Sequence, residues 1–142
     1  MTAPVPHPGP FGPLWLLLSP IGRVSREPYW LALALTWVLF MIPVAIWART
    51  VEVVEGRDMA SYLGDFINAN PLMPFMLIAF QWVELALVIK RLQDRGLSGL
   101  LAILVFMPYL NILFVIGLGF VPGTPGPNAY GPWPNGRWAR PK

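Results

Sequence analysis

Three long runs of apolar residues dominate the chain, and they contain almost no charged side chain. The runs cover residues 29–48, 71–89 and 100–120, and Glu84 is the one acidic or basic residue inside them. At a rise of about 1.5 Å per residue, each run forms a helix of about 30 Å, which matches the hydrocarbon core of a bilayer. The pattern predicts an all-α integral membrane protein with three transmembrane helices.

The third run differs from the other two because a proline interrupts it. Pro108 lies in its middle, and Asn111 follows about one turn later. Proline breaks the hydrogen-bond pattern of a helix, so the run forms either one kinked span or the two halves of a re-entrant hairpin. Each half of a hairpin would be only about 15 Å long. The sequence therefore favours the kinked span, with the hairpin as the alternative.

Shorter segments flank this membrane domain, which we place at residues 14–121. Residues 1–13 are rich in proline and predict a flexible N-terminus, while the apolar residues 14–20 predict a short segment lying at the membrane interface. Residues 122–142 are rich in proline and glycine, which interrupt regular structure and favour turns. They predict an extended tail on the membrane surface.

The composition supports a membrane protein. Hydrophobic residues make up 56% of the chain and charged residues only 12%, against about 25% charged in soluble domains. The net charge is +3, but the basic residues lie at the ends of the apolar runs, as membrane anchors do, so we expect no nucleic-acid partner. Cysteine is absent, which excludes disulfides and thiolate metal sites.

Basic residues also predict the orientation of the chain. Five of them lie before the first run or between the second and third runs, whereas only Arg49 and Arg57 lie between the first and second. Because cytoplasmic loops carry the excess of Lys and Arg, the N-terminus is expected in the cytoplasm. The five are Arg23, Arg26, Lys90, Arg91 and Arg95.

These five residues, together with Asp94, are also the candidate contacts to anionic lipid headgroups or to a partner. Asp94 can pair with Arg91 in its own turn, or with Arg23 or Arg26 across it. Gly96 suits the left-handed conformation that ends a helix, and Ser98 can cap the next helix. The pattern favours a structural clamp that holds a tight helical hairpin over a ligand site.

Glu84 is the candidate for chemistry inside the membrane. Gln81 lies one turn away on the same helix face, and Asn111 of the third run can supply an amide. Intramembrane acids are costly and mark functional sites by default, yet a proton or ion pathway needs a chain of such groups. We favour a role as hydrogen-bonding glue between helices.

Little else in the chain suits catalysis. The single histidine, His7, lies in the flexible N-terminus, and the sequence has no carboxylate pair, Ser/His/Asp set or cluster of metal ligands. We expect no enzyme activity, no catalytic residue, no cofactor and no metal.

Three motifs resemble the YhaH-like family of small bacterial inner-membrane proteins, a domain of unknown function. They are Gly22–Trp30, Lys90–Gly99 and Pro122–Pro132, in the order and spacing of that family. The resemblance implies a bacterial inner membrane, and it supplies no reaction or cofactor. The family usually has His at the position of Gln93 and a pair of Trp at Leu100 and Leu101, so a pH-sensing role for that His has no support here.

Taken together, the sequence predicts a small non-catalytic membrane protein that acts through contacts. We expect an accessory or scaffold subunit that packs against a larger membrane complex or against itself. One alternative is transport, or conduction of ions or protons, by an oligomer that uses Glu84. A second alternative is a module that binds anionic lipids.

Overall fold

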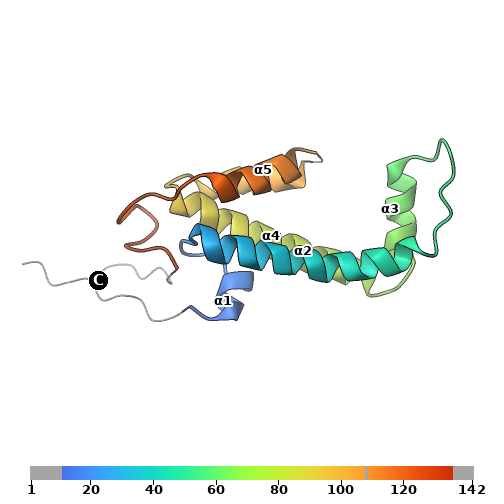
Figure 1. The fold of residues 1–142 in the computed structure, drawn as a ribbon, viewed down its shortest axis with the longest axis horizontal. Coiled ribbons are helices and arrows are strands. Elements are labelled where there is room, and N and C mark those ends of the chain that lie inside the picture. The colour runs from blue at the N-terminus through green and yellow to red at the C-terminus, as the bar shows by residue number, and fades with distance from the viewer. Residues whose placement is uncertain (1–10, 108, 136–142) are drawn as a thin grey trace, which may run out of the picture.

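The protein is elongated, and helices are the regular secondary structure of the described residues, which are 11–107 and 109–135 of the computed structural model (Figure 1). These residues contain five α-helices, one 3₁₀-helix and no β-strand. The elements in chain order are α1 (Pro13–Leu18), α2 (Arg26–Ala48), α3 (Met59–Asn68), α4 (Met73–Asp94), η1 (Gly99–Phe106) and α5 (Leu110–Phe120). The all-helical prediction is confirmed for this part of the chain.

The two longest helices, α2 and α4, lie side by side and form the frame of the molecule (Figure 1). Each is long and apolar enough to cross a membrane, and only 11% of the most apolar window of α2 and 28% of that of α4 are buried within the chain. Aromatic rings join the two helices, since Phe40 stacks on Phe80 at 4.2 Å and Trp37 meets Phe80 edge-on. The apolar surface that stays exposed suits a lipid environment, because its contact with water would cost free energy.

The third apolar run folds back on itself, so the preference for one kinked span is corrected in favour of the hairpin. Gly99 at its start lies against Ile89 and Gln93, and Leu118 near its end bonds to Arg91, so both ends meet the last turns of α4. Asn111, just after the bend, bonds to Glu84. Ten residues of α4 separate Glu84 from Asp94, so the hairpin reaches only about 15 Å along α4. Pro108, where the break was expected, lies outside the described residues.

Helix α3 was not expected from the sequence. It stands across the far end of the α2–α4 pair (Figure 1), where its Phe66 ring meets Phe40 and Trp47 edge-on. The Asp58 side chain accepts a hydrogen bond from the Ser61 amide and caps the helix. An acidic N-cap residue followed by apolar residues at helical spacing is a sequence pattern that predicts such a helix.

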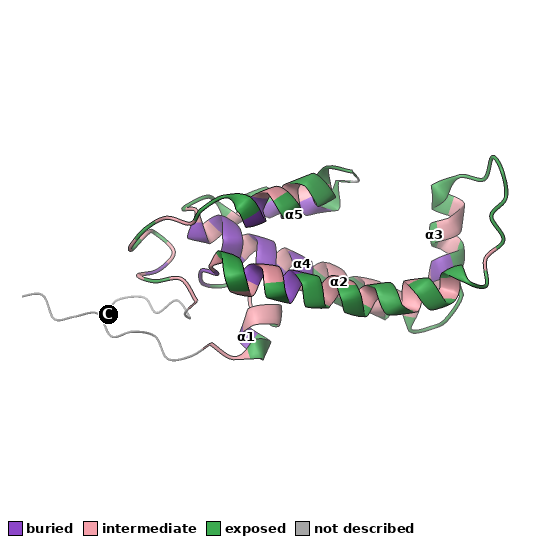
Figure 2. Cartoon of the chain, in the orientation of Figure 1, coloured by how far each residue is buried: buried purple, intermediate pink, exposed green. Residues whose placement is uncertain are grey.

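Buried residues gather at the end of the molecule opposite α3 (Figure 2). There α1, the hairpin and the tail close around the start of α2 and the end of α4. The apolar core consists of Val24, Tyr29, Ala32, Leu33, Leu87, Val88, Leu92, Ala102, Val105, Val115 and Leu118. This end is therefore the compact part of the fold, and it contains most of the buried charges.

Candidate functional site

The last turn of α4 carries the charged residues, and a tight cap fixes where it ends. Gly96 has a φ of 73°, the left-handed conformation predicted for it. The Gly96 amide donates to the Gln93 carbonyl at 3.0 Å, and the Leu97 amide donates to the Leu92 carbonyl at 2.9 Å. This pair of bonds is a Schellman cap. Ser98 then caps η1 by accepting from the Leu100 amide, as predicted.

Asp94 forms ion pairs with two arginines inside the protein. Its carboxylate lies 3.1 Å from the Arg23 guanidinium and 2.6 Å from that of Arg91, and the side chains are almost completely buried. Arg91 lies one turn earlier on the same face of α4, whereas Arg23 comes from the segment before α2. Of the pairings left open by the sequence, those with Arg91 and Arg23 are present. We call Arg23, Lys90, Arg91 and Asp94 the buried ionic cluster.

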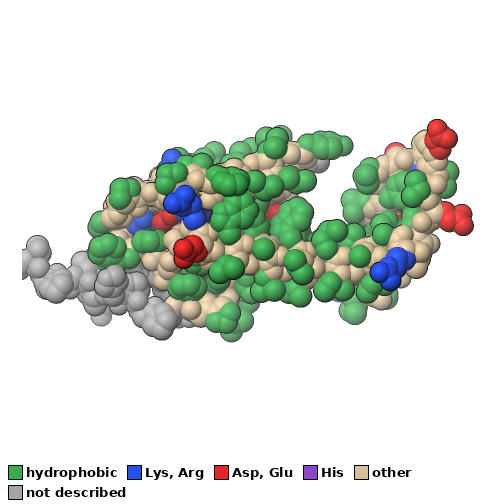
Figure 3. Space-filling model, in the orientation of Figure 1, with side chains coloured by type: hydrophobic (Ala, Val, Ile, Leu, Met, Phe, Trp, Pro, Cys, Tyr) green, Lys and Arg blue, Asp and Glu red, His purple; other side chains and the backbone are tan. Residues whose placement is uncertain are grey.

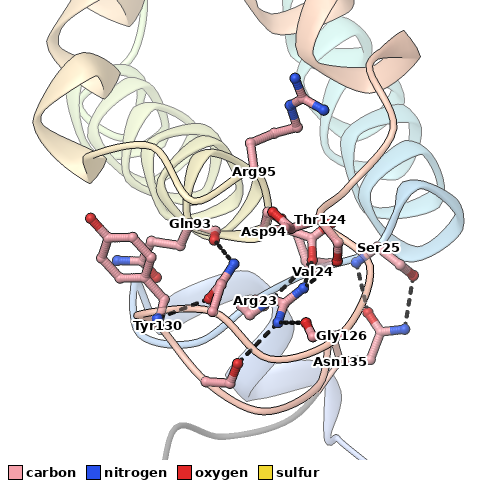
Figure 4. Close-up of polar contacts among 12 residues, drawn as sticks. Arg23, Val24, Ser25, Gln93, Asp94, Arg95, Thr124, Gly126, Tyr130 and Asn135 are labelled. Carbon is pink, nitrogen blue, oxygen red and sulfur yellow. Dashed lines mark hydrogen bonds and ion pairs between the residues drawn. The ribbon is translucent and has the colours of Figure 1, made fainter.

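Arg23 binds the proline- and glycine-rich tail (Figure 4). Its guanidinium donates to the carbonyls of Thr124 at 2.9 Å, Gly126 at 2.8 Å and Gly131 at 2.9 Å. Thr124 in turn donates its amide and its hydroxyl to the Asp94 carbonyl, each at 2.8 Å. The tail therefore wraps around one arginine, and its backbone carbonyls supply the acceptors.

Two asparagines and one close approach hold the tail in place. Asn135 bonds to both the amide and the hydroxyl of Ser25, and Asn128 donates to the Gln93 carbonyl at 2.9 Å (Figure 4). Gly123 lies so near the Asp94 carboxylate that a Cβ there would approach its Cγ to 2.9 Å. Glycine at this position is therefore a steric requirement.

The other two cations of the cluster bind the C-terminal ends of short helices. The Lys90 ammonium donates to the carbonyls of Trp15, Leu16 and Ser19 at the end of α1, and it lies 4.8 Å from the centre of the Trp15 ring. Arg91 donates to the carbonyls of Leu118 and Val121 at the end of α5 and to that of Val24. Helix C-termini carry unpaired carbonyls and partial negative charge, so they stabilise these buried cations.

The electrostatic balance of the cluster follows from these contacts. Three cations and one carboxylate are buried together, and backbone carbonyls compensate the excess of positive charge. Most of the N–H groups of these cations donate to oxygens of the chain itself, as expected of the predicted structural clamp. Burial separates Arg23, Lys90, Arg91 and Asp94 from the lipid contacts considered for them, while Arg26 stays exposed and Arg95 is half-buried and donates to the Pro122 carbonyl.

A second, smaller group of polar residues lies between α2, α4 and α5, about 15 Å along α4 from Asp94. Glu84 is fully buried and accepts a hydrogen bond from the Asn111 amide at 3.2 Å, so the expected amide from the third run is present. Asn111 Oδ1 and Gln81 Nε2 are buried without a hydrogen-bond partner, and the Trp37 indole lies close to the Glu84 carboxylate. Buried polar atoms of this kind usually bind water or mark a functional site.

Some residues of this region were missed by sequence reasoning. Tyr29 begins an apolar run, a position typical of an interfacial aromatic residue, but it is fully buried and its hydroxyl donates to the Val115 carbonyl at 2.7 Å. The tail groups that bind Arg23 are backbone carbonyls, which every residue has, so the sequence could not identify them. Among residues 11–107 and 109–135, no group of three or more His, Cys, Asp or Glu side chains could hold a metal ion.

Two long apolar helices, a short helical hairpin and an ionic cluster buried at one end define a small helical membrane protein. The chain belongs to the family DUF805, described as proteins of unknown function, which matches residues 17–132. Inner membrane protein YhaI of Escherichia coli strain K12 is 31% identical over 110 residues, which cover 78% of this chain and 80% of YhaI. The protein of the same name from strain O157:H7 matches equally well, and no solved structure matches. The predicted resemblance to a small bacterial inner-membrane family is confirmed.

Proposed function

We propose that this protein is a non-catalytic, multi-pass subunit of the bacterial inner membrane that packs against a larger membrane protein or against another copy of itself. In this proposal α2 and α4 cross the bilayer and the hairpin of η1 and α5 enters it from one side only. The N-terminus, the buried ionic cluster and the tail lie in the cytoplasm, because five basic residues flank that end of the helix pair and two flank the other.

The observation that carries this proposal is that the hairpin covers only about half of the helix pair. Beyond its bend, the surface between the hairpin and α3 is hollowed and lined by hydrophobic side chains (Figure 3). Phe40 stacks on Phe80 and meets Phe66 of α3 edge-on, so aromatic rings connect the helix pair to α3 in this region. A transmembrane helix of a partner fits there, since helices associate in lipid through packing of complementary surfaces.

The test is photo-crosslinking in native membranes, followed by gentle extraction. A photoreactive residue at Phe40 should capture a membrane protein or a second copy of the chain. The same residue at Leu100, which is 84% exposed on the outer side of the hairpin, is the control and should capture mainly lipid. A chain that emerges alone and monomeric, with Phe40 linked to lipid only, contradicts the accessory role.

A second candidate function, proton or ion conduction by an oligomer, rests on Glu84. A fully buried carboxylate that forms no ion pair among the described residues is unusual in a purely structural role. Glu84→Gln keeps the size and removes the charge, and Gln81→Ala is a neighbouring control. Flux into proteoliposomes that is lost in Glu84→Gln, with assembly intact, supports conduction. Unchanged flux, or loss of assembly, excludes it.

A further inference from the structure

A groove runs between α2 and α5 from the charged end of the molecule toward its middle. Its outer part is lined by Arg26, Glu27, Trp30, Leu31, Gly119 and Phe120. Its inner part, of about 230 Å³, is lined by Trp30, Leu33, Ala34, Trp37, Ile112, Val115 and Ile116. Trp30 lines both parts, so the two parts adjoin at its indole ring. The inner volume is several times the ~30 Å³ that a water molecule occupies in the liquid.

Trp30 and Gly119 set the shape of this groove. The Trp30 indole donates to the Gly119 carbonyl at 3.2 Å, and its ring lies so close to Gly119 that a Cβ there would overlap it. The ring also meets Phe120 edge-on. The junction therefore holds α2 and α5 at a fixed separation, and the groove is already formed without a ligand.

The chemistry of the groove changes sharply along its length. Arg26 and Glu27 stand at the outer end, where both are exposed and neither side chain forms a hydrogen bond or ion pair within the described residues. The inner lining is apolar throughout. Arg26 and Trp37 are 11 residues apart on α2, about 16 Å, which is close to half of the ~30 Å hydrocarbon core.

We propose that this groove binds one phospholipid with a primary-amine headgroup, of the phosphatidylethanolamine type. Arg26 binds the phosphate and Glu27 faces the ammonium group, while one acyl chain lies along Ala34 and Ile112. A cation and an anion side by side complement a zwitterionic headgroup, whereas a purely anionic lipid would bring its charge next to Glu27. The groove opens toward the bilayer, so a lipid can enter from the side.

A partner helix is the competing occupant, and the shape of the groove argues against it. The inner part is small, at about 230 Å³, whereas a helix needs an axial separation of about 8–10 Å from each neighbour. A flexible acyl chain fits such a space, and the charged mouth has no counterpart in a purely apolar helix face.

The experiment is native mass spectrometry of the full-length protein in detergent with phosphatidylethanolamine or phosphatidylglycerol added at equal concentration. The wild type should bind one phosphatidylethanolamine preferentially. Arg26→Gln should weaken this binding about tenfold, the loss expected for one charge-assisted contact of about 1.4 kcal/mol. Ala34→Phe should fill the inner groove and abolish it.

Matched controls lie at the other end of the same helix. Arg49→Gln and Ala45→Phe change the same residue types at exposed positions of α2 and its C-cap, and they should bind lipid like the wild type. Thermal unfolding of each variant separates lost binding from lost folding, and Arg26→Gln, an exposed change, keeps the test valid if Ala34→Phe does not fold. Equal binding of the two lipids, equal effects of Arg26→Gln and Arg49→Gln, or a second chain in place of lipid would each overturn the proposal.

Discussion

Neutralising Asp94 should destabilise the protein more than any surface charge change of the same kind. Asp94→Asn keeps the shape of the side chain but removes the anion from two buried ion pairs, at 3.1 Å from Arg23 and 2.6 Å from Arg91. Removing one partner of a buried pair costs about 3 to 5 kcal/mol. Both guanidiniums keep carbonyl acceptors, so we expect a loss near the lower limit, about 3 kcal/mol in the free energy of unfolding.

The chain offers a matched control for this change. Arg57 and Asp65 form an ion pair of 2.7 Å whose side chains are 31% and 50% exposed. Solvent screens such a pair, so Asp65→Asn should cost less than about 1 kcal/mol. Unfolding by titration with sodium dodecyl sulfate, followed by tryptophan fluorescence in mixed micelles, measures both. A loss for Asp94→Asn no larger than that for Asp65→Asn would refute the role assigned to the buried ionic cluster.

Three further predictions follow from the contacts of the tail, α1 and α3. Gly123→Ala should drive the tail away from Asp94 and speed its proteolysis, whereas Gly117→Ala, with open space around its Cβ, should leave the rate unchanged. Lys90→Met should leave the end of α1 without its donors and increase amide hydrogen exchange there at least tenfold; unchanged exchange contradicts the capping role. The hydrogen bond from the Ser61 hydroxyl lowers the pKa of Asp58, so the cap of α3 should persist as the pH falls and fray only through that lowered pKa. Fraying already above pH ~4, the ordinary aspartate value, in a pH series of amide exchange would contradict this.

Hydropathy predicted the two long helices well, because length and composition alone determine whether a segment can cross a bilayer. The predicted run 29–48 falls inside α2, and the run 71–89 falls inside α4 except for its first two residues. Both helices extend beyond the runs by a few residues, several of which are charged. The hairpin could not be chosen over a kinked span in the same way. The choice depends on whether both ends of the run find partners on α4, and those partners are tertiary contacts that no local pattern encodes.

The site was predictable in its charges and unpredictable in its acceptors. The pairing of Asp94 with Arg91 follows from a spacing of three residues on a helix, and Arg23 was one of two candidates across the turn. The fate of Lys90 could not be deduced, because its partners are three backbone carbonyls of α1. Every residue has such a carbonyl, so the sequence does not distinguish the ones that a cation selects.

Lys and Arg residues that are buried in the folded protein can still determine its orientation, because insertion into the membrane precedes folding. The distribution of Lys and Arg acts on topology while the chain inserts, before the tertiary contacts of the folded end form. Afterwards the same side chains serve the fold: Lys90 holds α1, Arg91 holds α5, and Asp94 holds Arg23 and the tail. A six-residue helix such as α1 is too short to be stable alone. Its presence therefore depends on α4, and the last turn of α4 is the element on which the folded end of the molecule is built.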